Sequence, residues 1–578
     1  INWTFAPMLD IVRDPRWGRV IESAGEDSFL TSQIAKAVVR GFQGESLTDT
    51  DSLLACAKHF VGYGAAEGGR DYDTTEISAN TLQNVYLPPF KAAIEAGVST
   101  VMSGFNDLGG TPVTGSNALI QGWLKGEQGF SGLVVSDWGS IADLEFFGVA
   151  KNGQHAAVSA LNAGIDMAMT HEAYEDHLIN AVNAEPRLLE RVNEAVGRVL
   201  LAKFRAGLFE QPYVDPDRHL SILGNAHHTK MALRLAEQSL VMLKNRNRIL
   251  PLQDSGVTIA VIGPHADSRR QHLGSWCLDG RPEDVVSIVE GIKQISLENT
   301  ILTENSGFSD EMVECALRAD LVVLCIGESH RRTGEARNIA DLILPAGQEE
   351  LIEAIGKTGK PMVVVQCCGR PLPSAAIEQY ADALIFAWQS GTQTGNAVAR
   401  TLYGCSNPSG KLTMTVPRTT GQIPIYYAQK RLGKMRAFPE YQAYKDSCHT
   451  PLYSFGFGLS YSHFSYHRLT LNKTHYAIGE DIVLSVEVTN TSNVDGYEVV
   501  QGYIAQFGTS TTRPNRELKG FEKVWIKGGE TKVVCLALSA KGLAFFGGYG
   551  RVEQEAGEIQ IFVGNDSNAT LSATCQVG

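Results

Sequence analysis

The feature that most constrains the fold is an alternation of short apolar runs and helical patterns through the first 208 residues. The strand-like runs are residues 4–9, 53–57, 99–103, 132–136 and 164–167. Helical patterns lie between them, for example over 32–42 and 81–96. This alternation predicts parallel strands joined by right-handed helical crossovers. Because a closed barrel needs eight strands and fewer are visible, we predict a truncated TIM-like (β/α) barrel over residues 1–208.

A second α/β unit is predicted further along the chain. Its apolar runs, at 258–263, 321–327, 361–367 and 383–387, are long and continuous. Such runs are typical of a parallel sheet that is covered by helices on both faces. The turn at 263–267 lacks the spaced glycines of a dinucleotide fingerprint, so no nucleotide is expected there. We predict an α/β sandwich over 236–418, after a linker over 209–235.

The last part of the chain has a different pattern. From residue 464 onward, short strands at 482–488, 499–504, 531–538 and 557–563 alternate apolar and polar residues, with Gly, Asn and Asp turns between them. This pattern predicts a β-sandwich over 463–578. A connecting segment rich in Tyr, Pro and Gly is expected over 419–462.

Composition excludes several classes of partner. The net charge of −13 argues against binding to nucleic acid or to an anionic membrane. No apolar run is long enough to span a membrane. The ten cysteines include the adjacent pair Cys367 and Cys368, and they lack the spacing of metal ligands. We therefore expect no metal, and the cysteine pattern fits cytoplasm and periplasm equally well.

Asp137 is the strongest candidate for chemistry. It follows the apolar run 130–135 and precedes Trp138, so it falls at the carboxyl end of a predicted strand. In an α/β barrel this edge carries the catalytic residues. A carboxylate beside a large aromatic ring is suited to be the nucleophile of a glycosidase. The alternative is that Asp137 caps a helix predicted over 141–147.

The surrounding motif resembles a known family. Val135-Ser136-Asp137-Trp138 is similar to the nucleophile motif of the family 3 glycoside hydrolases. Further family-like motifs follow the same order: Ala6-Pro7-Met8-Leu9-Asp10, Arg13-Asp14-Pro15-Arg16-Trp17-Gly18-Arg19, Gly25-Glu26-Asp27, Lys58-His59-Phe60, Val101-Met102-Ser103-Gly104-Phe105-Asn106, and the run 451–461. The resemblance covers essentially the whole chain and is closest to the bacterial periplasmic β-glucosidase branch. It implies that the terminal β-sandwich is fibronectin-III-like.

The resemblance also implies roles for individual residues. Asp137 would be the nucleophile, and Arg19, Lys58 and His59 would surround the first sugar ring and hydrogen-bond to its hydroxyls. Cationic neighbours would keep Asp137 ionised. The alternatives are a surface pair for Lys58-His59 and a structural ion pair of Arg19 with Glu22 or Glu26.

Three apolar residues complete the expected sugar site. Met102 and Phe105 would line the pocket, and Trp138 would stack on the aglycone sugar. Many relatives have Tyr where this chain has Phe105, so a hydroxyl contact to the nucleophile is not expected here. Trp138 could instead be a core residue.

The acid/base is expected in the second α/β unit, where two glutamates compete. Glu328 directly ends a strand, as in relatives with a Gly-Glu acid/base, and Glu335 lies on the following loop. A glutamate close to two arginines would stay ionised, which opposes its action as an acid. The sequence therefore favours Glu328, although either residue could be an ion-pair partner of Arg331 or Arg337.

These features together predict a retaining exo-acting β-glucosidase that removes terminal glucose from short β-glucans or aryl glucosides without a metal or organic cofactor. A β-xylosidase, a broader glycosidase and an inactive sugar-binding remnant are the alternatives. The loop after Lys58-His59-Phe60 lacks the histidines of the aminosugar-specific branch, which disfavours that activity.

Two further expectations concern the context of the chain. The family's barrel normally begins upstream of Ile1, in a part that includes a strand-end Asp that holds sugar hydroxyls. A parallel sheet without its first strands would expose an open edge, so we predict a homodimer. The resemblance implies a periplasmic or secreted bacterial protein, with no signal peptide visible and a cytoplasmic location still open.

Overall fold

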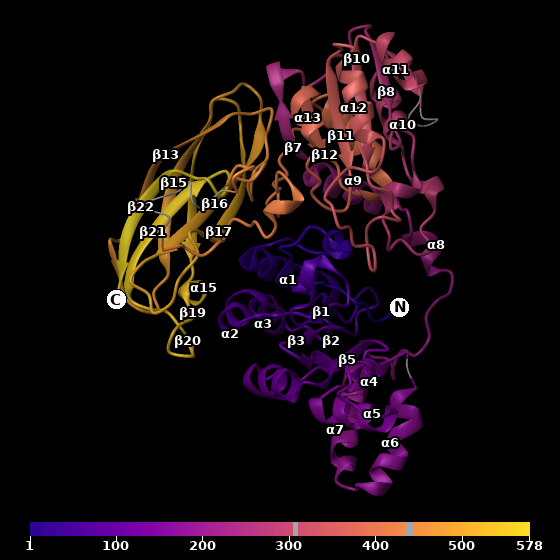
Figure 1. Cartoon of the computed structure of the whole chain (residues 1–578), viewed down its shortest axis with the longest axis vertical. Helices are drawn as coiled ribbons and strands as arrows, with labels where there is room; N and C mark the ends of the chain where they lie inside the picture. Colours follow the sequence, from indigo (N-terminus) through magenta and orange to yellow (C-terminus); the bar gives the residue numbers. More distant parts are fainter. Residues whose placement is uncertain (171, 305–309, 434–443) are drawn as a thin grey trace. The chain divides into compact units, whose positions relative to one another are not determined.

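The structure is a computed structural model that describes residues 1–170, 172–304, 310–433 and 444–578. These residues form two compact units (Figure 1). The first unit comprises Ile1–Trp17 and Glu22–Arg218, and the second comprises Gly18–Ile21 and His219–Gly578. Residues 434–443 of the expected connecting segment lie outside the described residues. The domain boundaries expected from the sequence stay predictions.

The first unit contains a parallel four-stranded sheet in the order β1-β2-β5-β6. Its strands are β1 (Cys56–Phe60), β2 (Thr100–Ser103), β5 (Leu133–Trp138) and β6 (Met167–Met169), and β3 (Asp107–Leu108) pairs with β4 (Thr111–Pro112) in a separate hairpin. In place of the expected strand at 4–9 the structure has two isolated parallel bridges, Met8 with Lys58 and, just before the expected range, Trp3 with Leu54. The last strand begins later than expected because Gly164 ends the preceding helix in a left-handed conformation, with φ of 109°.

Helices connect these strands. They include α1 (Ser28–Gln43), α2 (Ala79–Thr81), the π-helix η4 (Leu82–Tyr86), α3 (Pro88–Glu95), the π-helix η6 (Ala118–Glu127), α4 (Asp143–Phe146), α5 (Gly153–Ala163), α6 (Ala173–Ala184) and α7 (Leu188–Arg205). Asp27 caps α1, because its side chain accepts a hydrogen bond from the backbone N–H of Leu30. The single helix expected over 81–96 is divided, and α3 begins at Pro88, a residue favoured in a first helical turn.

Alternate residues of the first sheet belong to two different apolar clusters. Val101 and Val134 lie in the large core that the helices share, whereas Cys56, Met102 and Val135 form a smaller cluster. Burial raises the pKa of the Cys56 thiol and the charge of Asp137 helps to raise it, so Asp137 lies on the side of the sheet where this smaller cluster packs. The sheet therefore directs Asp137 to the face opposite the main helical core.

The second unit begins with a six-stranded sheet in the order β7-β12-β11-β10-β8-β9. Its strands are β7 (Val241–Asn245), β8 (Thr258–Ile262), β9 (Thr300–Glu304), β10 (Leu321–Gly327), β11 (Met362–Cys367) and β12 (Ala383–Phe386). All pairings are parallel except that of β7 with β12. The chain moves from β8 to β9 on one side and to β10 on the other, so the loops after β8 and β10 lie at a topological switch point.

After the short helix α8 (Arg218–Ile222), the helices of this part of the chain are α9 (Ala226–Ser239), α10 (Ile288–Ile295), α11 (Asp310–Leu317), α12 (Gln348–Gly356), α13 (Ala375–Tyr380) and α14 (Thr394–Leu402). Two separate apolar clusters cover the two faces of the sheet. Val322 and Val364 belong to one cluster, and Val323 and Val365 belong to the other. The continuous apolar runs in the sequence are explained by this burial on both faces.

The chain ends in a β-sandwich. Its sheets have the orders β13-β15-β18 and β14-β22-β21-β16-β17. The elements are β13 (Phe464–Leu471), β14 (His475–Tyr476), β15 (Ile482–Asn490), β16 (Gly496–Gln506), β17 (Glu517–Ile526), β18 (Thr531–Leu538), α15 (Ala540–Leu543), β19 (Phe545–Phe546), β20 (Val552–Glu553), β21 (Gly557–Gly564) and β22 (Leu571–Val577). The expected fold class, a barrel-type unit followed by an α/β sandwich and a β-sandwich, is confirmed. Within the described residues, no helix is both long and apolar enough to cross a membrane.

Candidate active site

Asp137 lies near the carboxyl end of β5, as the sequence predicts. Its side chain is 9% exposed. The Oδ1 atom accepts a hydrogen bond of 2.7 Å from the backbone N–H of Trp138. The helix that follows begins at Asp143 with Ala142 as its N-cap, so Asp137 does not cap it. The capping alternative is therefore wrong, and the carboxylate is held by its own strand end.

His59 lies at the corresponding end of β1 and is 1% exposed. Its Nδ1 is 2.8 Å from Oδ2 of Asp10, and the same oxygen accepts the backbone N–H of His59 at 3.1 Å. Its Nε2 is 3.6 Å from Oδ2 of Asp137. The imidazole thus lies between two buried carboxylates. Lys58, the residue before it, is half-buried, so the pair is not a surface feature.

An aromatic group lies next to His59 on the loops after β1 and β2. Tyr63 contacts the edge of the His59 ring at a centroid distance of 5.3 Å, and Phe105 contacts Tyr63 at 5.8 Å. Tyr72 contacts Phe105 at 5.1 Å, is 45% exposed and has a positive φ of 65°. A bulky residue in this backbone region is strained, and such strain clusters at functional sites. Met102 is 2% exposed and packs with Cys56 and Val135.

Trp138 has the opposite environment to that of Asp137. Its indole is 66% exposed although it adjoins a buried carboxylate. The alternative of a core tryptophan is therefore wrong. A large exposed ring at a strand end can stack on the apolar face of a sugar.

Glu328 lies directly after β10 in the second unit, and its side chain has no exposed surface. Arg370 Nε donates to its Oε2 at 3.1 Å, and Arg332 Nε donates to its Oε1 at 3.0 Å. Burial raises the pKa of Glu328, and the positive charges of Arg370 and Arg332 oppose that rise. Both oxygens therefore accept a hydrogen bond from a guanidinium group, and the side chain is closed off from solvent.

Arg370 also shapes the loop that follows Glu328. Its Nη2 donates to the backbone carbonyls of Arg332, at 2.7 Å, and Arg337, at 3.0 Å. Arg337 in turn donates to the carbonyls of His330 and Thr333. The buried Glu328–Arg370 pair thus anchors a loop that is closed by several backbone contacts.

Glu335 lies on this loop, and its side chain is 25% exposed. Its Oε1 is 3.7 Å from Nη1 of Arg19, which is only 2% exposed. Arg19 belongs to the short segment that is part of the second unit, and the backbone N–H of Gly334 donates to the carbonyl of Gly18 at 2.7 Å. The structure therefore brings Arg19 together with Glu335, one of the two acid/base candidates.

Sequence reasoning missed several residues near these groups. Asp10 ends a strand-like run, and Arg370 follows β11 closely, so position at a strand end could have identified both. Among the described residues, no cluster of three or more His, Cys, Asp or Glu could hold a metal ion.

Comparisons with known proteins agree with this arrangement over nearly the whole chain. Residues 1–202 match the glycosyl hydrolase family 3 N-terminal domain, and residues 240–461 match the C-terminal domain of the same family. Residues 498–567 match a fibronectin type III-like domain.

Individual relatives are also extensive matches. The chain is 38% identical to the periplasmic β-glucosidase of Salmonella typhimurium, over 98% of this chain and 79% of that protein. It is 38% identical to a β-xylosidase of Formosa agariphila, over 98% and 82% of the two chains. The crystal structure of a β-glucosidase from Listeria innocua with isofagomine matches all of this chain and 82% of that chain, at 37% identity and a TM-score of 0.96. The chain therefore belongs to glycosyl hydrolase family 3 and is a glycoside hydrolase.

Proposed function

We propose that the protein is a retaining exo-acting β-glucosidase, which removes terminal non-reducing β-D-glucosyl residues from short β-glucans and aryl glucosides. The observation that carries this proposal is the environment of Asp137. One oxygen is oriented by the Trp138 N–H, and the other faces the His59 imidazole. The β-glucosidases of Salmonella typhimurium and Listeria innocua support glucose as the sugar.

The reaction proceeds in two displacements. Asp137 attacks the anomeric carbon while a carboxylic acid gives its proton to the glycosidic oxygen, so the aglycone leaves as an alcohol. Water then gives a proton to the acid/base, which is now a carboxylate, and attacks the anomeric carbon of the glucosyl ester. The ester bond breaks, Asp137 regains its charge, and glucose is released with its β-configuration retained.

We propose Glu335, rather than the Glu328 that the sequence favours, as the acid/base. An acid/base has to reach the glycosidic oxygen of the substrate. Arg332 and Arg370 both hydrogen-bond to Glu328, whereas the Oε1 of Glu335 is 3.7 Å from Arg19 and its side chain is partly exposed. The partial exposure of its side chain therefore favours Glu335.

The remaining residues bind the substrate. We propose that Lys58 and Arg19 hydrogen-bond to hydroxyls of the first sugar, and such bonds strengthen as the oxocarbenium-like transition state forms. We assign His59 to the nucleophile rather than to a hydroxyl, because its Nδ1 contacts Asp10 and its Nε2 faces Asp137. Met102 and Phe105 line the pocket. Trp138 stacks on the aglycone.

The test is hydrolysis of 4-nitrophenyl β-glucoside by the parent chain and by Asp137→Ala. We expect the variant to lose on the order of 10⁴-fold or more in kcat, as for removal of other catalytic nucleophiles or their partners. Azide should restore turnover and yield an α-glucosyl azide. NMR of the first product of the parent should show the β-anomer. Asp73→Asn, which removes a carboxylate paired with the exposed Arg70, is the matched control and should remain active. Equal activity of the parent and Asp137→Ala would refute the proposal.

A β-xylosidase is the second candidate, because the Formosa agariphila enzyme of that name is as similar as the β-glucosidase. The ratio of kcat/KM for aryl β-glucoside and aryl β-xyloside decides between them. Laminaribiose, which a Listeria innocua β-glucosidase variant binds in a crystal, is the first disaccharide to test.

We also propose a periplasmic location, from the name of the Salmonella typhimurium relative. The homodimer stays a prediction. Light scattering at micromolar concentration tests it, and a monomeric mass would contradict it.

A further inference from the structure

His59 is held between two carboxylates of the first unit that are both buried. Asp10 is 2% exposed, His59 is 1% exposed, and the side chain of Asp137 is 9% exposed. The contact of Nδ1 with Asp10 is a hydrogen bond at 2.8 Å, and the contact of Nε2 with Asp137 is an ion-pair distance of 3.6 Å. Neither contact crosses from one unit to the other.

Whether these two contacts are attractive depends on how many protons the imidazole carries. A neutral imidazole has one N–H, so one of its nitrogens would point a lone pair at a carboxylate oxygen. With the proton on Nδ1, the lone pair of Nε2 would face Asp137. With the proton on Nε2, the lone pair of Nδ1 would face Asp10 at 2.8 Å. Only an imidazolium donates toward both carboxylates.

Asp10 is oriented to remain ionised in this arrangement. Its Oδ2 is within hydrogen-bond distance of both the Nδ1 atom and the backbone N–H of His59, the latter at 3.1 Å. Hydrogen bonds donated to a carboxylate stabilise its charged form. Other titratable groups near the ring are Lys58, the residue before His59, and Tyr63, whose ring edge contacts it and whose hydroxyl donates to Asp71. The positive charge of Lys58 would disfavour protonation of His59. The negative charge of Asp10 is therefore needed to stabilise the imidazolium.

We propose that Asp10 is a positioning residue that keeps His59 as an imidazolium whose Nε2–H faces the nucleophile. The inference rests on the proposed function, because it assigns Asp137 as that nucleophile. In the first displacement Asp137 loses negative charge, and in the second it regains it. A fixed positive charge beside Asp137 therefore stabilises the transition state of the second step relative to the glucosyl ester.

Two kinetic expectations follow for Asp10→Asn. Hydrolysis of the glucosyl ester should slow by about tenfold or more, because the charge that develops on Asp137 loses its partner. Formation of the ester should change much less, since the cation stabilises the ionised Asp137 before that step. With 2,4-dinitrophenyl β-glucoside, the variant should therefore accumulate more glucosyl-enzyme, measured by rapid quench and intact mass spectrometry. A loosened site would slow both steps without this accumulation.

The protonation state can be tested without any turnover. The intact chain is labelled with ¹⁵N-histidine, and the His59 signals are assigned by their loss in His59→Gln. We expect both ring nitrogens of His59 to be protonated at neutral pH in the parent and only one in Asp10→Asn. A neutral His59 in the parent would overturn the proposal, even if the enzyme hydrolyses glucosides. An imidazolium in an inactive chain would instead refute the proposed function alone.

A double-mutant cycle tests whether Asp10 acts through His59. In the His59→Gln background, Asp10→Asn should have no further effect on ester hydrolysis. Asp10→Glu, which keeps the charge, should recover part of the rate, and Asp73→Asn should leave it unchanged. Independent, additive effects of Asp10→Asn and His59→Gln would overturn the positioning role. Thermal unfolding of each variant confirms that the rates refer to folded protein.

Discussion

The two ends of the parallel sheet in the first unit each hold a buried aspartate, but in opposite surroundings. Asp137 lies near the carboxyl end of β5, and Asp166 lies just before β6. Oδ1 of Asp166 is 2.7 Å from Nζ of Lys125, and its Oδ2 accepts the backbone N–H of Val134 at 2.9 Å. Oδ2 of Asp137 lies 3.6 Å from Nε2 of His59 in the same unit.

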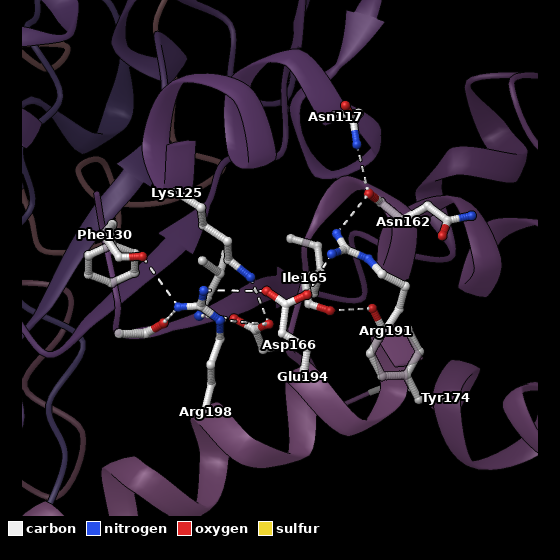
Figure 2. A network of polar contacts seen from close by, with 12 residues as sticks. Asn117, Lys125, Phe130, Asn162, Ile165, Asp166, Tyr174, Arg191, Glu194 and Arg198 are labelled. Atoms are coloured by element: carbon white, nitrogen blue, oxygen red, sulfur yellow. Dashed lines mark hydrogen bonds and ion pairs between the residues drawn. The ribbon is translucent and has the colours of Figure 1, made fainter. Parts of the chain in front are cut away.

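Figure 2 shows how far the network around Asp166 extends. Arg198 of α7 donates to the carbonyls of Phe130 and Gly132 and pairs with Glu194. Lys125 and Asp166 are 4% and 3% exposed. Burial raises the pKa of Asp166 and lowers that of Lys125, while each partner's charge opposes the effect of burial on the other. This network ties η6 and α7 to the start of β5.

The comparison separates anchoring carboxylates from reactive ones. Each oxygen of Asp166 and of Glu328 accepts a hydrogen bond from an N–H group, at 2.7–3.1 Å. These carboxylates therefore hold neighbouring segments in place. Asp137 accepts an N–H on Oδ1 alone among these contacts, and its Oδ2 is 3.6 Å from Nε2 of His59, while Oε1 of Glu335 is 3.7 Å from Nη1 of Arg19. A longer contact stabilises the charge and leaves the carboxylate able to form and break a bond.

The largest expected effect sharpens this comparison within the second unit. Glu335→Ala should lower kcat/KM for a disaccharide by about 10²- to 10⁴-fold, because the leaving group receives no proton. The effect should be smaller for dinitrophenyl glucoside, and azide should yield a β-glucosyl azide. Glu328→Gln is the matched variant, and its main effect should be a lower unfolding temperature, since Arg370 would be left buried without its counter-charge. If azide rescued a Glu328 variant but not the Glu335 variant, Glu328 would be the acid/base instead.

The next prediction concerns the anchor at the other end of the first sheet. Asp166→Asn should lower the free energy of unfolding by about 3–5 kcal/mol, because it leaves the buried Lys125 unpaired. Denaturant titration measures this loss. Activity per folded molecule should stay near that of the parent. Replacing both partners, with Lys125→Met and Asp166→Leu, should recover much of the stability. A loss of activity without a loss of stability would show that the two ends of the sheet are not distinct in role.

Two buried histidines extend the comparison to groups that are held neutral. His265 and His272 lie in the second unit with rings 6.4 Å apart, and both are buried. Burial lowers the pKa of His265 to about 4 and that of His272 to about 3, the latter lowered further by the charge of His265. The folded state therefore resists protonation of both rings.

The pH dependence follows from the direction of these shifts. In the unfolded chain both histidines bind a proton near pH 6.5. Their contribution to stability is therefore complete above pH 6.5 and is lost as the pH falls toward 4, by about 1.4 kcal/mol per pH unit for each ring. Calorimetry of the parent and His272→Gln should show a shallower acid dependence in the variant. His228→Gln, at an exposed position, should not change that dependence, and equal slopes in all three proteins would contradict the prediction.

The sequence was informative where one local pattern determines the structure. The run 531–538 is strand β18, and the end of β5 lies where the apolar run predicts it. The sequence was uninformative where two residues that are in contact lie far apart in the chain. Arg370 is 42 residues from Glu328, and no local pattern shows that the two pair. Asp10 is 49 residues from His59, and their contact depends on the isolated bridge that aligns Met8 with Lys58.

The smallest expected effect concerns the exposed neighbour of the nucleophile. Trp138 shares its strand end with Asp137 but is 66% exposed, so it should bind substrate without taking part in bond cleavage. Trp138→Ala should raise KM for laminaribiose about tenfold, which is about 1.4 kcal/mol of lost stacking, and change kcat much less. KM for an alkyl glucoside with a small aglycone should hardly change, because no ring is present to stack. Phe146→Ala removes an aromatic side chain that is 89% exposed on α4 and serves as the control. If Trp138→Ala lowered kcat as strongly as it raised KM, the indole would have to hold Asp137 itself, and the division between buried charge and exposed ring at this strand end would fail.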